Sequence, residues 1–241
     1  MSLRRTSVLP GQSPRQRRPR SWPLPTALLL LVLVPALAGT FRVVQLMGGP
    51  ELIPADVRFA AFPLPLIVHI VAAIVFAVVG AFQFVPRFRR NHRRWHRIAG
   101  RVVFGAGLLV AGSALWMTLF YAADPDSGSL LYVLRLVFGS AMGVCLVLGV
   151  TTIRRGDVVA HRACLISAYA IGMAAGTQAI TGGISEALFG AGVLQGDLAK
   201  ASGWVINLAV AAWVIRRQDG SGSSSRSARA SRRAATAGTL S

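Results

Sequence analysis

Six long apolar segments divide the chain, and no other feature of the sequence constrains its fold as strongly. They cover approximately residues 22–41, 63–85, 101–122, 129–153, 159–181 and 201–215. A helix needs about 20 apolar residues to cross the hydrocarbon core of a bilayer, and these segments approach or meet that length. The chain is 54% hydrophobic and 14% charged, so it has too few polar residues to cover a soluble globule of its size. We predict an all-α polytopic membrane helix bundle with about six transmembrane helices.

The cations gather in alternate connections between these segments. Of the 26 lysines and arginines, 22 lie in residues 1–21, 87–101, 154–162 and 216–241. The other connections contain six of the eight acidic residues. Because cytoplasmic loops carry the excess of Lys and Arg, we predict that both termini are cytoplasmic. The net charge of +18 then favours anionic lipids at the cytoplasmic face of the bilayer as partners, rather than nucleic acid.

The composition of the two ends differs from that of the apolar middle. Residues 1–21 and 218–241 are rich in Ser, Arg, Ala and Gly, so we expect disordered cytoplasmic tails on either side of a transmembrane domain at 22–217. The basic start, the apolar run 24–38 and the small residues at 36–38 also fit a cleaved signal peptide. We favour an uncleaved first helix, because the basic region is long and the other segments are membrane-embedded in either case.

A shift of 65 residues aligns two parts of the chain with each other. The shift superposes the second apolar segment on the fourth, and the third on the fifth. It also aligns Arg89, Arg90, His96 and Arg97 with Arg154, Arg155, His161 and Arg162. The sequence therefore predicts a core, at 63–183, of two similar hairpins formed by helices two and three and by helices four and five.

The repeat places ligand-type side chains in matching positions at the cytoplasmic end. His92 and His96 align with Asp157 and His161, and a spacing of four residues puts each pair on one face of a helix. All four together suit zinc or another divalent metal, whereas His96 and His161 alone suit bis-histidine ligation of haem b. In the simpler alternative, Asn91 and Asp157 are helix N-caps and His92 is an inert interfacial residue.

Arginines surround these histidines. The candidate anion-binding or lipid-binding residues at this end are Arg97, Arg101, Arg154, Arg155 and Arg162. Their charge disfavours a bare dication and favours a lipid phosphate, a quinone head group or the propionates of a haem. The alternative is that a basic loop simply marks the cytoplasmic end of membrane helices.

Two ionisable residues lie inside apolar segments, near their outer ends. His69 is about 9 Å along the second helix, and Arg135 has a similar depth in the fourth. Such groups are costly in lipid, so His69 is a candidate second-site ligand or proton carrier and Arg135 a candidate anion site. Arg135 could also extend to the interface. Residues 177–181, with two threonines and Gln178, either line the same site or hydrogen-bond to neighbouring helices.

Residues 63–183 resemble a family of uncharacterised bacterial multi-pass membrane proteins, classed as a domain of unknown function. Three elements carry the resemblance: His69 near the outer end of a helix, the motif H-R-x-x-G-R at 96–101, and R-R-x-D-x-x-x-H-R at 154–162. After the second motif the chain departs from the family, because Ala163, Cys164 and Ser167 replace basic and aromatic residues. The resemblance implies a six-helix protein of the bacterial cytoplasmic membrane, and no established activity.

Motifs of soluble enzymes are missing: the sequence has no GxSxG, Walker loop or HExxH, so we lean against an enzyme. Our first hypothesis is a membrane protein that binds a haem or metal cofactor through His96 and His161. The second is a non-enzymatic protein that binds anionic lipid or a small hydrophobic ligand. Proton-coupled transport is the weakest, because the sequence shows no intramembrane carboxylate and no clearly broken helix.

Overall fold

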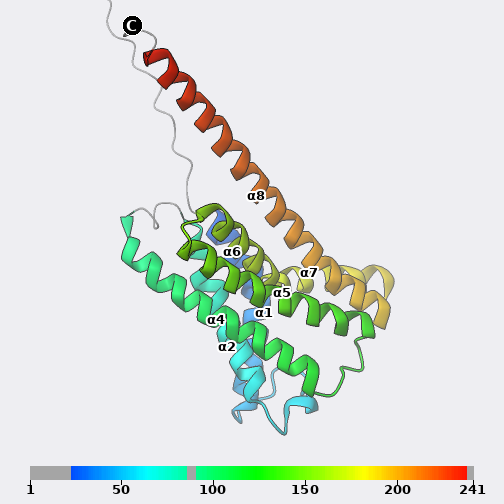
Figure 1. The fold of residues 1–241 in the computed structure, drawn as a ribbon. Coiled ribbons are helices and arrows are strands. Elements are labelled where there is room, and N and C mark those ends of the chain that lie inside the picture. Colours follow the sequence, from blue (N-terminus) through cyan, green and yellow to red (C-terminus); the bar gives the residue numbers. More distant parts are fainter. Residues whose placement is uncertain (1–22, 86–90, 238–241) are drawn as a thin grey trace, which may run out of the picture.

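The computed structural model describes residues 23–85 and 91–237, with residues 219–237 described by their backbone alone. Within this part the chain forms helices and no strand. The elements are α1 (Pro23–Leu46), the short η1 (Val57–Phe59), α2 (Leu64–Gln83), α4 (Arg93–Phe120), α5 (Ser129–Arg154), α6 (Val158–Gly172), α7 (Ala174–Phe189) and α8 (Val193–Ala237) (Figure 1). Five helices are long and apolar enough to cross a membrane, and α6 with α7 forms a sixth span if the bent pair is counted as one. The predicted all-α membrane bundle of about six helices is confirmed.

The internal repeat is visible in where the helices begin. The starts of α2 and α5 are 65 residues apart, and so are those of α4 and α6. α2 packs chiefly against α4 and α5 against α6, while α4 also lies along α5. The core therefore consists of the two predicted hairpins. α1 packs against α2 and α7, and α8 covers α6 and α7.

The ring of Phe76 on α2 joins the two hairpins, and its side chain is only 2% exposed. A Cβ atom added to Gly107 on α4 would lie 2.8 Å from this ring, and one added to Gly172 on α6 would lie 2.7 Å from it. The repeat aligns these two glycines with each other. Each hairpin thus contributes a residue without a side chain, which lets its helix backbone approach the same ring closely.

The fifth predicted span is bent, so the expectation that no helix is clearly broken is wrong. α6 and α7 meet at Met173 and differ in direction by 41°. Asn207 of α8 bridges this bend, because its Nδ2 donates to the carbonyl of Ala170 at 3.1 Å and its Oδ1 accepts from Thr177 Oγ1 at 2.7 Å. The side-chain amide of Asn207 thus hydrogen-bonds to α6 before the bend and to α7 after it, where the regular helical hydrogen bonds are interrupted.

The sixth span begins at Val193 rather than at Ala201, and it contains a carboxylate. Asp197 is 1% exposed and accepts hydrogen bonds from the backbone N–H groups of Gly128 at 3.0 Å and Leu131 at 3.1 Å. These groups belong to the first turn of α5, where N–H groups lack partners within the helix. Gly128 is the N-cap residue of α5 and has no side chain to cap it, so α8 provides the cap. Asp197 lies in the first turns of α8, beside the connection that precedes α5, and the expectation of no intramembrane carboxylate stays a prediction.

The domain boundaries predicted from composition can be compared with where the described helices end. α8 continues as a helix beyond residue 217 (Figure 1), into the segment whose composition predicts a disordered tail. The predicted boundary between 217 and 218 stays a prediction. The predicted tail at 1–21 lies outside the described residues.

Replacing Asp197 tests whether this buried cap holds α5 and α8 together. We expect Asp197→Ala to lower the free energy of unfolding by about 2 kcal/mol, because one buried and one partly buried N–H group lose their acceptor. Unfolding in mixed detergent micelles would measure the change. The exposed Asp126 in the same region is the matched control, and Asp126→Ala should change stability by less than about 0.5 kcal/mol. Equal effects of the two substitutions would contradict the proposed capping role.

Candidate functional site

The helices α4 and α6 both begin at one end of the bundle, which we call the arginine-rich end and define by residues 91–101 and 154–162. α4 begins eight residues before the predicted start at Arg101, so the H-R-x-x-G-R motif forms its first turns. The backbone N–H of His96 donates to the His92 carbonyl at 2.9 Å, and that of His161 donates to the Asp157 carbonyl at 3.1 Å. The two candidate ligands thus occupy the same position relative to their N-caps.

His161 is held by its own hairpin. Its Nδ1 lies 2.6 Å from the carbonyl oxygen of Gly149 in α5. A carbonyl can only accept, so Nδ1 carries a hydrogen, and in the neutral imidazole Nε2 then keeps a lone pair. Histidines that bind metals commonly orient themselves through such a bond from the other ring nitrogen. The neutral form of His161 is therefore the tautomer that a ligand role through Nε2 requires.

The four side chains predicted as metal ligands do not form a site in the structure. Among the described residues, no three His, Cys, Asp or Glu side chains stand close enough to hold a metal ion. Asp157 accepts a hydrogen bond from the Ala160 N–H at 2.9 Å, which confirms that it caps α6. The N-cap of α4 is His92 and not Asn91. The predicted ligands do not form a site because α4 and α6, which carry them, each pack against α5. The carboxylate of Asp157 also faces its own helix.

The arginines at this end are exposed, and none of them forms an ion pair with a described residue. They are Arg93, Arg94, Arg97, Arg101, Arg154, Arg155 and Arg162. The one carboxylate among residues 91–101 and 154–162 is Asp157. The positive charge of the arginine-rich end is thus not neutralised within the described part of the protein. Arg89 and Arg90, which the repeat aligns with Arg154 and Arg155, lie outside it.

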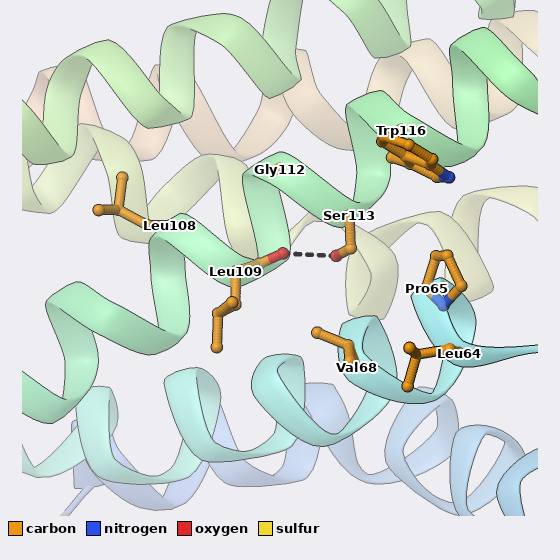
Figure 2. Close-up of a pocket in the computed structure, with 8 residues that line it drawn as sticks. All are labelled: Leu64, Pro65, Val68, Leu108, Leu109, Gly112, Ser113 and Trp116. Atoms are coloured by element: carbon orange, nitrogen blue, oxygen red, sulfur yellow. Dashed lines mark hydrogen bonds between the residues drawn. The ribbon is translucent and has the colours of Figure 1, made fainter.

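His69 has a partner in the neighbouring helix. Its Nδ1 lies 3.0 Å from the hydroxyl oxygen of Ser113 on α4. Ser113 also borders a groove of about 310 Å³ between α2 and α4 (Figure 2). The lining residues are Leu64, Pro65, Val68, Leu108, Leu109, Gly112, Ser113 and Trp116. The groove lies near the bundle end opposite the arginine-rich end, because α2 begins and α4 ends there.

Arg135 is half-buried on α5 and forms no ion pair with a described residue. Asp124 and Asp197 attract its guanidinium group, and Arg58 repels it. Among the described residues, no contact joins Arg135 to His69, so the structure does not show the two in one site. The nearby polar residues of α7 bind α8 instead: Gln178 donates to the Lys200 carbonyl at 2.8 Å, and Thr181 to that of Ala199 at 2.7 Å. This confirms the alternative that they satisfy neighbouring helices.

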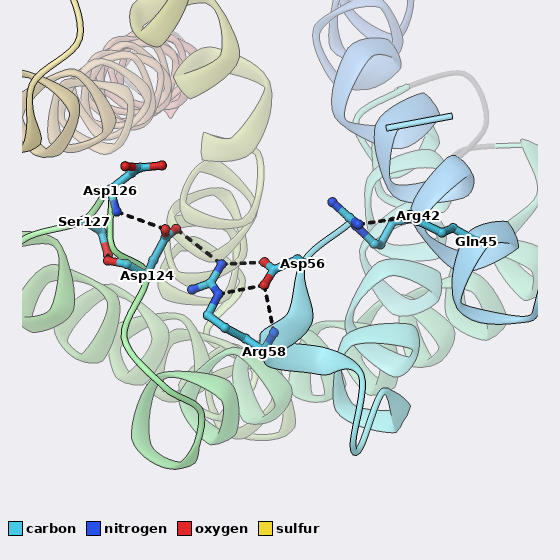
Figure 3. A network of polar contacts seen from close by, with 7 residues as sticks. All are labelled: Arg42, Gln45, Asp56, Arg58, Asp124, Asp126 and Ser127. Atoms are coloured by element: carbon cyan, nitrogen blue, oxygen red, sulfur yellow. Dashed lines mark hydrogen bonds and ion pairs between the residues drawn. The ribbon is translucent and has the colours of Figure 1, made fainter. Parts of the chain in front are cut away.

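A polar network that the sequence analysis missed joins two connections at the end opposite the arginines (Figure 3). Arg58 binds both carboxylate oxygens of Asp56, at 2.9 and 2.6 Å, and lies 3.4 Å from Asp124. Hydrogen bonding from Arg58 lowers the pKa of Asp56 below its ordinary value of 3.8. Tyr121 donates its hydroxyl hydrogen to the Phe62 carbonyl in the same region. The short spacing of Asp56 and Arg58 is the one signal in the sequence that indicates part of this network.

Comparison with known families gives one match. The family model described as "Predicted membrane protein (DUF2306)" matches residues 66–215, from the start of α2 to the membrane part of α8. No curated protein and no solved structure matches the chain. The family match confirms the resemblance to an uncharacterised multi-pass membrane family.

The contribution of the Asp56–Arg58 contact to the free energy of unfolding should depend on pH. A carboxylate with a lowered pKa stabilises the folded state above its unfolded pKa of about 4, and this contribution is lost as the pH falls through the folded pKa. We expect the difference in unfolding free energy between wild type and Asp56→Asn to be constant above about pH 4 and to vanish on further acidification. Unfolding in detergent at a series of pH values measures it. A difference that persists at low pH would refute the assignment.

Proposed function

The chain belongs to the DUF2306 family of membrane proteins, and we propose that it binds anionic lipid at its arginine-rich end. In this proposal the arginine-rich end faces the cytoplasm of a bacterial inner membrane, and both termini lie on the same side. The binding residues are Arg97, Arg101, Arg154, Arg155 and Arg162. In this proposal the protein is not an enzyme.

One observation carries this proposal: seven exposed arginines in α4, α5, α6 and the turn between α5 and α6 have no ion pair among the described residues. Concentrated positive charge at a membrane surface needs counterions, and the cytoplasmic leaflet supplies them as anionic lipids. Each arginine near such a surface contributes about 1 kcal/mol. The same asymmetry supports the cytoplasmic orientation, because cytoplasmic loops carry the excess of arginine.

The arrangement within α4 favours a phosphate group in particular. Arg97 and Arg101 are four residues apart in one helix, so their side chains lie on the same face. Guanidinium groups bind phosphate oxygens through paired hydrogen bonds. The first turn of α4 adds its partial positive charge close by. Arg97 and Arg101 can therefore hold one lipid phosphate between them.

The proposal predicts that lipid binding decreases stepwise as these arginines are replaced. We expect Arg97→Gln to weaken binding of phosphatidylglycerol about fivefold, and Arg97→Gln with Arg101→Gln to weaken it further. Lipid retained by the purified protein, counted by native mass spectrometry, measures this. His96→Ala and Arg42→Gln, at the opposite end, are controls that should retain lipid as wild type does. Loss of all retention with His96→Ala, or no change with the arginine variants, would exclude the proposal.

A second candidate function is ligation of haem b by His96 and His161, with His69 as a ligand at a second site. The bond from His161 Nδ1 to the Gly149 carbonyl favours it, because it leaves Nε2 free for an axial ligand. This candidate predicts a Soret band in the detergent-purified protein that His161→Ala removes and Arg216→Gln retains. A protein without a Soret band and without bound iron, zinc or copper would exclude it.

A further inference from the structure

The groove between α2 and α4 combines apolar walls with two polar side-chain groups, the hydroxyl of Ser113 and the indole N–H of Trp116. Two of its residues, Leu64 and Trp116, have 55% and 48% of their surface exposed on the outside of membrane-spanning helices. A Cβ atom added to Gly112 would meet no other atom within 4 Å, so the groove is open at this position. Figure 2 shows Trp116 of α4 opposite Pro65 of α2. Molecules dissolved in the bilayer can therefore enter from the lipid.

Ser113 contributes a hydroxyl oxygen, and the hydrogen bonds of this oxygen define what it can bind. The hydroxyl donates its single hydrogen within its own helix, to the nearby Leu109 carbonyl with the Val110 carbonyl as a second acceptor at 3.2 Å. We assign that hydrogen to the carbonyls, so that His69 Nδ1, 3.0 Å away, is the donor in the bond between the two residues. Ser113 Oγ then has one lone pair left. It can accept a further hydrogen bond but has no hydrogen to donate.

We propose that this groove binds a lipid-soluble aromatic compound that carries a hydroxyl group, such as an alkylated hydroquinone. The hydroxyl donates to Ser113 Oγ, and the ring lies against the indole of Trp116. A volume of about 310 Å³ is at the lower end of the range for small-molecule sites and fits a single substituted ring. His69 is a positioning residue, because it holds Ser113 Oγ in its acceptor role.

This hydrogen-bond arrangement gives the site a chemical preference. A hydroxyl group satisfies the free lone pair of Ser113 Oγ, whereas a quinone carbonyl can only accept and finds no donor at this oxygen when the ring lies against the face of the Trp116 indole. A hydrocarbon chain makes apolar contacts alone. The reduced, hydroxylated form of a ring compound should therefore bind more tightly than its oxidised form by about one hydrogen bond, which is about tenfold in affinity.

The test uses the full-length protein in lipid nanodiscs and three matched probes: a radiolabelled alkylhydroquinone, the corresponding alkylbenzoquinone and the corresponding alkylbenzene. Displacement of the hydroquinone gives the relative affinities. We expect the hydroquinone to bind about tenfold more tightly than either competitor. Equal affinities of all three probes would show a groove for ordinary acyl chains and would overturn the proposal.

Two pairs of variants locate the site. Gly112→Leu should fill the groove and weaken hydroquinone binding at least tenfold, whereas Gly105→Leu is the matched control on the same helix, since a Cβ there also meets no atom within 4 Å. Equal binding by these two variants would overturn the proposal. Ser113→Ala and His69→Phe should lower hydroquinone affinity to that of alkylbenzene and leave alkylbenzene binding unchanged. Arg97→Gln should leave all three affinities unchanged, so this proposal and that of lipid binding can fail separately.

Discussion

The requirement that backbone polar groups find partners without water governs this structure. In the hydrocarbon of a bilayer an unpaired N–H or C=O costs several kcal/mol, so the spans are helices. Where a helix starts or bends inside the protein, a side chain from another helix supplies the missing partner. Asp197 does so at the start of α5, and Asn207 does so at the bend between α6 and α7. Both residues belong to α8, so this last helix completes the hydrogen bonding of the second hairpin.

Close packing supplies the rest of the cohesion. No hydrophobic force drives helices together in lipid, so they associate through contacts between close surfaces. Phe76 fills the space between Gly107 and Gly172, which occupy equivalent places in the two hairpins. Tyr169 extends this contact, since its hydroxyl donates to the Ala77 carbonyl at 2.7 Å. The two hairpins therefore match in where their helices start and in the positions of these glycines. They differ in the aromatic ring between the glycines, which the first hairpin alone supplies through Phe76.

The two ends of the bundle differ in how their charges are balanced. At one end Arg58 is paired with Asp56 and Asp124, so the charges satisfy one another and join two connections. At the other end the arginines have no such partners among the described residues. This difference supports assigning the first end to structure and the second to contact with the membrane. Between them, the His69–Ser113 pair places polar atoms beside an open groove within the span.

The sequence alone determined the class of fold, the number of spans and the repeat, because apolar length and charge asymmetry are properties of consecutive residues. It also located His69, His161 and the arginines. Only the tertiary structure decided which of them meet: His161 binds α5, His69 binds Ser113, and no three of the predicted metal ligands come together among the described residues. The capping role of Asp197 and the bend at Met173 were missed for the same reason. Whether a polar residue is buried, and which group satisfies it, depends on helices far apart in the chain, and hydropathy along a single segment carries no information about them.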